Sequence, residues 1–466
     1  MKRVGTWMLR KWRRRRQWMP GAARRSTAQL AAVESVAPTL TAPESARSGK
    51  RRGARRGPGA VLPLEKPDVR LGPEGRAFDA ILLVVVITMV GMGLVMVYSS
   101  SAIKGELQFG DEAFFLRRQI WHVAFGLVLM MVGLGVDYRW YKRLIYPVLG
   151  SSVLMLVLVL LIGHEYNNAQ RWLRVGGVTF QPSEWVKVSL IMYMAYSIDK
   201  KGYKIKKFSI GFIPHLLILG VMALLLLKQP DFGTVVICAT MMFIMLFVGG
   251  ARAGYIAMFV LLGAVAAAYG IVTSSYRMER VQAYLDPWKD PHGASYQISQ
   301  SLTAIGSGGL TGKGLGAGHS KLGYVPELWN DFIATAVGEE LGLLGLLMLC
   351  VLVLMLVWRG LKIAFGAREM FGMYLAFGLT TLFGLQSVVN LCVVTGLLPN
   401  KGLTLPFISY GGSSMFVSLF VIGVLLNISQ AREDTWESDR AERERIQMEK
   451  RLEKKRKRYA RTREVR

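Results

Sequence analysis

Uncharged apolar runs recur along the middle of the chain. The first covers residues 81–98, and as a helix rising about 1.5 Å per residue it is long enough to cross the hydrocarbon core of a bilayer. Comparable runs follow at 119–136, 144–163, 184–198, 211–227, 231–250, 253–273, 332–357, 371–393 and 404–428. The pattern predicts an all-α polytopic membrane protein with about ten transmembrane helices, of which the fourth is the shortest.

The connections between these runs alternate in charge. Lys and Arg gather in Tyr138 to Arg143, in the five lysines between 200 and 207, at Arg252 and in 358–368. Because positive residues accumulate on the cytoplasmic side, both termini are expected to be cytoplasmic. The opposite face receives short loops and one large extracytoplasmic loop, residues 274–331, between helices seven and eight. A loop of that length with a mixed composition is expected to be ordered and functional.

Composition agrees with a membrane protein. Hydrophobic residues make up 52% of the 466 residues and the mean hydropathy is +0.33, which excludes an ordinary soluble enzyme. Much of the net charge of +27 lies in the tails, where residues 1–77 hold 19 Lys and Arg against 5 Asp and Glu, and residues 431–466 hold 14 against 9. Basic tails beside apolar helices suit anionic lipid better than nucleic acid.

Three segments follow from this distribution. Residues 1–77 are expected to form a disordered basic cytoplasmic tail, 78–430 a ten-helix domain, and 431–466 a charged cytoplasmic tail. The N-terminal segment has no apolar stretch typical of a signal peptide, so the chain is expected to insert through its own helices. The cysteines Cys238, Cys350 and Cys392 are isolated in apolar runs, and this pattern indicates neither a disulfide framework nor a zinc site.

Two Asp-Pro pairs stand four residues apart in the large loop, at Asp286 and Asp290. Each proline forces the preceding aspartate out of helical conformation, so both carboxylates lie on bent backbone outside the membrane. A carboxylate held at that boundary can act as a general base for a hydroxyl group. The same pairs are good turn formers, and spacing alone does not separate the two interpretations.

The glycine-rich stretch from Gly308 to Gly316 lacks the order of residues that defines a nucleotide P-loop, and no strand precedes it. Its backbone amides are candidates for contact with a diphosphate or sugar, and a flexible lid is equally compatible with the pattern.

Charged residues near or within the apolar runs are candidates for function, because burying charge in a membrane is costly. Glu184 and Lys187 are three residues apart and can pair on one helix face, and Asp231 begins a helix whose N-terminus favours its charge. An interfacial anchor or an internal ion pair remains an alternative for each. All map to the outer leaflet, where the cationic members suit a lipid-linked phosphate. The set is Arg171, Arg174, Glu184, Lys187, Asp231, Glu339, Glu340 and Lys401.

Six ordered motifs over about residues 80–430 resemble the FtsW/RodA family, also called SEDS proteins. They are Asn168-Ala169-Gln170-Arg171-Trp172, Gln181-Pro182-Ser183-Glu184-Trp185-Val186-Lys187, Gln229-Pro230-Asp231-Phe232-Gly233-Thr234, Asp290-Pro291-His292-Gly293-Ala294-Ser295-Tyr296-Gln297, Gly338-Glu339-Glu340-Leu341-Gly342 and the segment from Leu398 to Ser414.

The resemblance implies a ten-helix peptidoglycan glycosyltransferase that polymerises lipid II outside the bacterial cytoplasmic membrane with a class B penicillin-binding transpeptidase and other division proteins. It implies that Asp290 is the essential aspartate, acting as general base on the acceptor 4-hydroxyl. It also places five residues at polar cavity positions of the family. The five residues are Arg171, Glu184, Lys187, Asp231 and Lys401.

A divalent cation (Mg²⁺ or Mn²⁺) can bridge the diphosphate, but no ligand cluster in the sequence demands one and no other cofactor is expected.

Two departures from the family pattern affect loop contacts. An asparagine stands in Asn167-Asn168-Ala169 where the family has glycine, and Trp329-Asn330-Asp331 replaces His-Thr-Asp. The segments around Trp288 and Pro406, with the long tails, are more similar to the division-type members than to the elongation type, which indicates a place at the division septum. A lipid II flippase and a structural scaffold for division partners remain alternatives.

Overall fold

The computed structural model describes residues 78–166, 169–175, 178–290, 293, 295–400, 402–430 and 448. The predicted tails, save for Met448, and Lys401 therefore lie outside the described residues.

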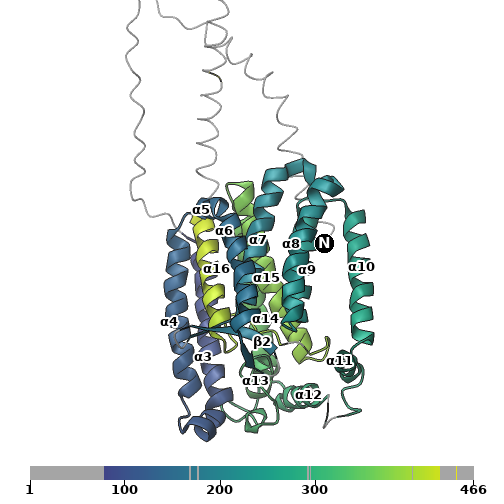
Figure 1. The fold of residues 1–466 in the computed structure, drawn as a ribbon. Coiled ribbons are helices and arrows are strands. Elements are labelled where there is room, and N and C mark those ends of the chain that lie inside the picture. Colours follow the sequence, from purple (N-terminus) through teal and green to yellow (C-terminus); the bar gives the residue numbers. More distant parts are fainter. Residues whose placement is uncertain are drawn as a thin grey trace, which may run out of the picture. The chain divides into compact units, whose positions relative to one another are not determined.

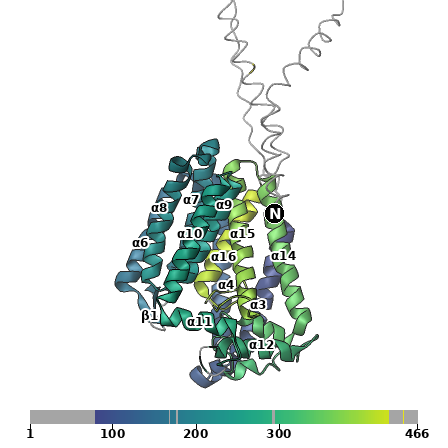
Figure 2. The ribbon, with the colours of Figure 1, turned by 90° about the vertical axis from the view of Figure 1, so that its right-hand side faces the viewer.

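The part of the chain that the structure describes contains ten long helices, and Figures 1 and 2 show them running side by side. Each corresponds to one of the ten predicted apolar runs. Eight spans in the described part of the chain are long and apolar enough to cross a membrane, and one of them consists of α8 together with the preceding turn from Phe208. The other two helices are α9, which is shorter than these spans, and α7, which carries charged residues in its first and last turns. The ten are α3 (Ala80–Phe109), α4 (Phe114–Gly135), α6 (Ile145–Ile162), α7 (Pro182–Lys201), α8 (Ile213–Lys228), α9 (Phe232–Val248), α10 (Ala253–Val272), α14 (Gly342–Gly366), α15 (Met370–Val394) and α16 (Gly412–Gln430). The all-α polytopic fold is thus confirmed.

Short elements join the long helices. A small antiparallel sheet, in the order β1-β2-β3, follows α6 where the sequence predicted only a loop, and pairs Leu173 with Phe180. The predicted large loop contains the helices α11 and α12. The short elements are α5 (Tyr138–Arg143), β1 (His164–Tyr166), β2 (Ala169–Val175), β3 (Val178–Phe180), η1 (Gly202–Lys206), η2 (Phe208–Phe212), α11 (Ser275–Leu285), α12 (Tyr296–Gly308), η3 (Ser320–Leu322) and α13 (Ile333–Glu340).

The helices α7, α15 and α16 form the most buried part of the bundle. Glycines let α4 and α16 approach closely: a Cβ at Gly133 would stand 2.7 Å from the carbonyl oxygen of Phe420, and one at Gly423 would collide with the backbone of Met130. Small residues at such contacts stabilise helix pairs through van der Waals packing, which is the main attraction available inside lipid. By contrast, no residue of α10 is buried, and this helix stands at the edge of the bundle (Figure 1).

Two predicted spans begin later than expected. The run 332–357 is divided into α13 and α14, because the chain turns at Gly342 with a φ of 66°, which favours glycine. The run 404–428 starts with a non-helical segment that contains Pro406, and α16 begins only at Gly412. Both segments are apolar because they are buried in protein, and hydropathy alone does not distinguish that from a membrane helix.

Candidate functional site

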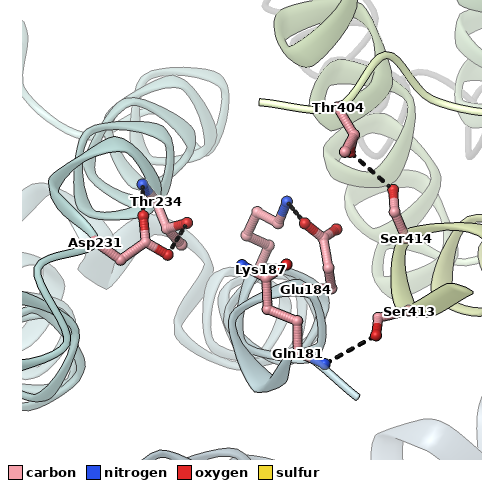
Figure 3. A network of polar contacts seen from close by, with 8 residues as sticks. All are labelled: Gln181, Glu184, Lys187, Asp231, Thr234, Thr404, Ser413 and Ser414. Atoms are coloured by element: carbon pink, nitrogen blue, oxygen red, sulfur yellow. Dashed lines mark hydrogen bonds and ion pairs between the residues drawn. The ribbon is translucent and has the colours of Figure 1, made fainter. Parts of the chain in front are cut away.

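The first two turns of α7 carry a buried ion pair. Pro182 begins the helix, and the Nζ of Lys187 lies 2.8 Å from Oε1 of Glu184 (Figure 3). The Lys187 side chain is 2% exposed and that of Glu184 13%. The predicted pairing on one face is confirmed. A pair this deeply buried must be held together, because either charge alone would be strongly unfavourable.

Asp231 caps the N-terminus of α9, as the sequence predicted. Its Oδ1 accepts a hydrogen bond from the backbone N–H of Thr234 at 3.1 Å, and its Oδ2 accepts one from the Thr234 hydroxyl at 2.7 Å. These two donors satisfy the carboxylate at a site that is 8% exposed, and the positive end of the helix dipole lies beside it.

The cap of α9 and the ion pair of α7 belong to one polar cluster. Figure 3 shows Asp231 and the Glu184–Lys187 pair on the neighbouring helices α9 and α7. The start of α16 completes the cluster, since Ser413 accepts a hydrogen bond from the backbone N–H of Gln181 at 2.8 Å. The fold thus brings together three of the five residues predicted to bind substrate.

Arg171 has a positioning role in the structure. It lies on β2, where its Nε donates to the carbonyl of Gln229 at 3.1 Å and a terminal nitrogen donates to that of Pro230 at 2.6 Å. The amide of Gln229 in turn donates to the carbonyl of Leu156 at 2.9 Å. These contacts fasten the turn between α8 and α9, the turn that leads directly to Asp231.

Asp290 is exposed and lies between α11 and α12. Its carboxylate packs so closely on Gly293 that a Cβ at this glycine would collide with it. Gly293 also lines a cavity of about 310 Å³ whose other walls come from α11, α12 and two loops. The predicted catalytic carboxylate is therefore at the edge of an open cavity.

A chain of hydrogen bonds holds the walls of this cavity. Arg280 of α11 donates to the carbonyl of Asn400 at 3.3 Å, and the amide of Asn400 donates to Oε1 of Gln297 at 2.5 Å. Gln297 of α12 then donates to the carbonyl of Pro326 at 3.0 Å. Amide and guanidinium groups around a cavity beside a carboxylate are suited to bind a polyhydroxylated ligand.

Asp331 is a site residue that sequence reasoning missed, although the motif containing it had been compared with the family pattern. Burial, and secondarily the charge of Glu327, raises its pKa from 3.8 to about 7, against the opposing effect of Arg171 and Arg280. The Asn390 amide donates to the carbonyls of Asp331 at 2.8 Å and of Leu403 at 2.6 Å, which ties together the segments on either side of α15. No local pattern around Asp331 signals this placement, because its partners are distant in sequence.

The glycine-rich stretch is fixed by two buried carboxylates of α13. Glu339 accepts hydrogen bonds from the Nζ of Lys313 at 2.8 Å and from the backbone N–H groups of His319 and Ser320 at 2.8 and 3.0 Å. Glu340 binds the hydroxyl of Ser99 at 2.6 Å, and the backbone N–H of Gly316 at 3.1 Å. Among the amides predicted as candidates for a phosphate or sugar, that of Gly316 is bound by a carboxylate, and those of Gly312, Lys313 and Gly314 are bound by backbone carbonyls.

The described residues contain no group of three or more His, Cys, Asp or Glu that could hold a metal ion. Lys401, the fifth predicted substrate-binding residue, lies outside them, as does His292.

Comparison with known proteins gives consistent matches. Residues 79–434 match the FtsW/RodA/SpoVE family of cell cycle proteins. The probable peptidoglycan glycosyltransferase FtsW of Trichlorobacter lovleyi is 45% identical over 354 residues, covering 76% of this chain and 93% of that protein. The corresponding protein of Geobacter sulfurreducens is 46% identical over 76% of this chain and 96% of its own, and stage V sporulation protein E of Bacillus subtilis is 40% identical over 76% and 97%.

Solved structures agree. A chain from a peptidoglycan synthase complex that coordinates polymerization and crosslinking is 29% identical with a TM-score of 0.65, covering 77% of this chain and 99% of that one. The rod shape determining protein RodA of Thermus thermophilus is 28% identical with a TM-score of 0.59, covering 78% and 99%.

Proposed function

Because the chain belongs to the FtsW/RodA/SpoVE family of cell cycle proteins, we propose that it is a peptidoglycan glycosyltransferase that polymerises lipid II at the outer face of the bacterial cytoplasmic membrane. The observation that carries this proposal is the identity of 44–46% to relatives named probable peptidoglycan glycosyltransferase FtsW, over nearly their whole length. The fold supports it, since it brings the motifs of Lys187, Asp231 and Ser413 into one polar cluster and places the motif of Asp290 beside a cavity.

Asp290 is the proposed general base. As the acceptor 4-hydroxyl attacks the anomeric carbon of the donor, its proton passes to this carboxylate and the bond to undecaprenyl diphosphate breaks. One carboxylate suffices for such a transfer, unlike hydrolysis, which uses two. The exposed position of Asp290 beside the cavity gives a hydroxyl group access to it.

The leaving diphosphate gathers negative charge, and cationic side chains of the site stabilise it. Lys187 and Lys401 are the proposed electrostatic contacts, while Glu184, Asp231 and Arg171 shape the site. The hydrogen bonds of Arg171 to two backbone carbonyls support a positioning role for this residue. A divalent cation bridging the diphosphate is compatible with this arrangement and would have to be bound largely by the substrate.

The orientation proposed from the sequence has both termini in the cytoplasm and the segment of Asp290 outside. In the same scheme, residues 78–430 form the catalytic domain and the segments 1–77 and 431–466 are cytoplasmic tails. Higher identity to the FtsW relatives than to RodA favours the division type, and hence the septum. The peptidoglycan synthase complex among the similar structures supports a class B penicillin-binding transpeptidase as partner.

The decisive experiment is glycan polymerisation from labelled lipid II by the purified protein with its cognate transpeptidase. Asp290→Asn should abolish polymer formation, whereas Asp286→Asn should retain it. Asp286 is a matched control because its Oδ1 accepts the backbone N–H of Trp288 at 3.2 Å, a contact that an asparagine oxygen also makes. Equal polymer from wild type and Asp290→Asn would remove Asp290 from the reaction.

A lipid II flippase is the second candidate, favoured by the buried ion pair of α7, since intramembrane charges often line translocation paths. Transport of labelled lipid II across proteoliposomes, without polymer formation by wild type and partner, would establish the flippase instead. If the protein shows neither polymerisation nor transport, the result would indicate a division scaffold.

A further inference from the structure

The connection between α7 and α8 carries a dense group of lysines. We call residues 199–212 the lysine hairpin. It contains five lysines and a single acidic residue, Asp199, whose carboxylate is already paired with Lys142 at 2.7 Å. Four of the five are exposed, and the hairpin lies at the end of the bundle where α3 begins and α16 ends (Figure 1). The lysines are Lys200, Lys201, Lys204, Lys206 and Lys207.

The hairpin is a rigid platform. Ile205 is 2% exposed, and its carbonyl lies so close to Gly211 that a side chain there would collide with it. The ring of Phe208 packs on Phe259 of α10 and on Phe212, which is itself buried. The lysines therefore stand on a fixed backbone, and binding a ligand there requires little ordering of the protein.

The fifth lysine, Lys201, has a buried ammonium group that makes no hydrogen bond with any part of the chain that the structure describes. Its neighbour His215 is no acceptor, because Nδ1 is bound to the carbonyl of Gly211 at 2.5 Å and Nε2 to the hydroxyl of Ser197 at 2.9 Å. Burial lowers the pKa of Lys201. A buried polar group without a partner requires an explanation, and an external anion supplies one.

We propose that the lysine hairpin binds the phosphate of an anionic phospholipid, with the exposed lysines around the headgroup and the Lys201 side chain, which is partly at the surface, rotating outward to bring its ammonium to the phosphate. Charge complementarity supports this ligand, since clusters of four to eight lysines beside a membrane helix attract anionic headgroups. Tyr203 is 61% exposed on the same hairpin, and tyrosine is enriched where membrane and water meet. A lipid phosphate bound there would give the Lys201 ammonium the partner that the described chain does not supply.

The test uses the full-length protein in detergent and measures bound lipid by native mass spectrometry. Phosphatidylglycerol should bind more tightly than the zwitterionic phosphatidylethanolamine. Lys201→Gln should weaken phosphatidylglycerol binding at least about fivefold, which corresponds to about 1 kcal/mol for one lysine near a membrane surface. Lys321→Gln is the matched control: it removes the same charge from the loop between α12 and α13, at the opposite end of the bundle (Figure 1).

Two further sets of measurements keep this test decisive. If Lys201→Gln does not fold, Lys201→Arg should retain binding, and the triple replacement of the exposed Lys204, Lys206 and Lys207 by glutamine should lose it. Unchanged lipid binding in the folded Lys201→Gln protein or in the triple variant would overturn the proposal. Displacement of the lipid by inorganic phosphate would also overturn it, in favour of a site for free phosphate. None of these readouts depends on glycan polymerisation.

Discussion

Replacing Lys187 by methionine tests whether the ion pair of α7 is a structural element or part of the substrate site. At 2.8 Å the attraction between Lys187 and Glu184 is about 6 kcal/mol for an effective dielectric constant of about 20. Desolvation of both ions offsets most of it, so the intact pair contributes little net stability. Lys187→Met leaves a carboxylate buried without a partner, and this should lower the free energy of unfolding by about 3–5 kcal/mol.

The measurement is unfolding in mixed micelles titrated with dodecyl sulfate, together with polymerisation on the same preparations. The double variant Glu184→Met/Lys187→Met removes both charges and should recover to within about 1 kcal/mol of wild type, because apolar residues of similar volume often replace a buried pair without loss. Polymerisation should stay low in both variants. A double variant that polymerises normally would show the pair to be only structural, and an unchanged stability of Lys187→Met would refute the electrostatic reasoning itself.

Three other predictions follow from the site. Gly293→Ala should abolish polymerisation without removing any chemical group, because its Cβ displaces the Asp290 carboxylate; wild-type rates would show that the carboxylate can move freely. The pKa of Asp331 is raised from 3.8 to about 7 in the folded state. Between pH 3.8 and about 7 the folded protein therefore holds a proton on Asp331 that the unfolded chain has released, so the free energy of unfolding falls as the pH rises through this range. Asp331→Asn should flatten the pH dependence of stability, measured by thermal unfolding across this pH range. An unaltered slope would assign the pH dependence to another group. Glu339→Gln should weaken the contact with Lys313 and expose the glycine-rich stretch to limited proteolysis, whereas the same cleavage pattern as wild type would mean that backbone contacts hold the loop.

The helical bundle could be predicted from sequence because a membrane imposes a long apolar run on each crossing helix. Local contacts could be predicted equally well. Glu184 and Lys187 pair because they are three residues apart, and Asp231 caps α9 because it precedes an apolar run. Both contacts lie within one helical turn, so their geometry is determined by spacing alone.

Contacts between distant segments could not be predicted in this way. The burial of Asp331 depends on α15 and on the segment after it, more than fifty residues away, and the sheet at β2 depends on pairing that its short strands do not signal. The late start of α16 has the same origin. A buried non-helical segment and a membrane helix both exclude charge, and only the positions of neighbouring helices separate them.

Buried charge in this protein serves two different purposes, and the partners of each group reveal which. Glu339 and Glu340 are 1% and 2% exposed, yet their oxygens bind a lysine, a hydroxyl and backbone N–H groups of one loop. Such groups, engaged by contacts within the protein, hold the glycine-rich stretch in place. Lys187 differs, because one carboxylate is its bonded partner and an ammonium group has three donors. Among the charged residues that the sequence singled out, Lys187 therefore has donors to spare and is the stronger candidate for substrate contact.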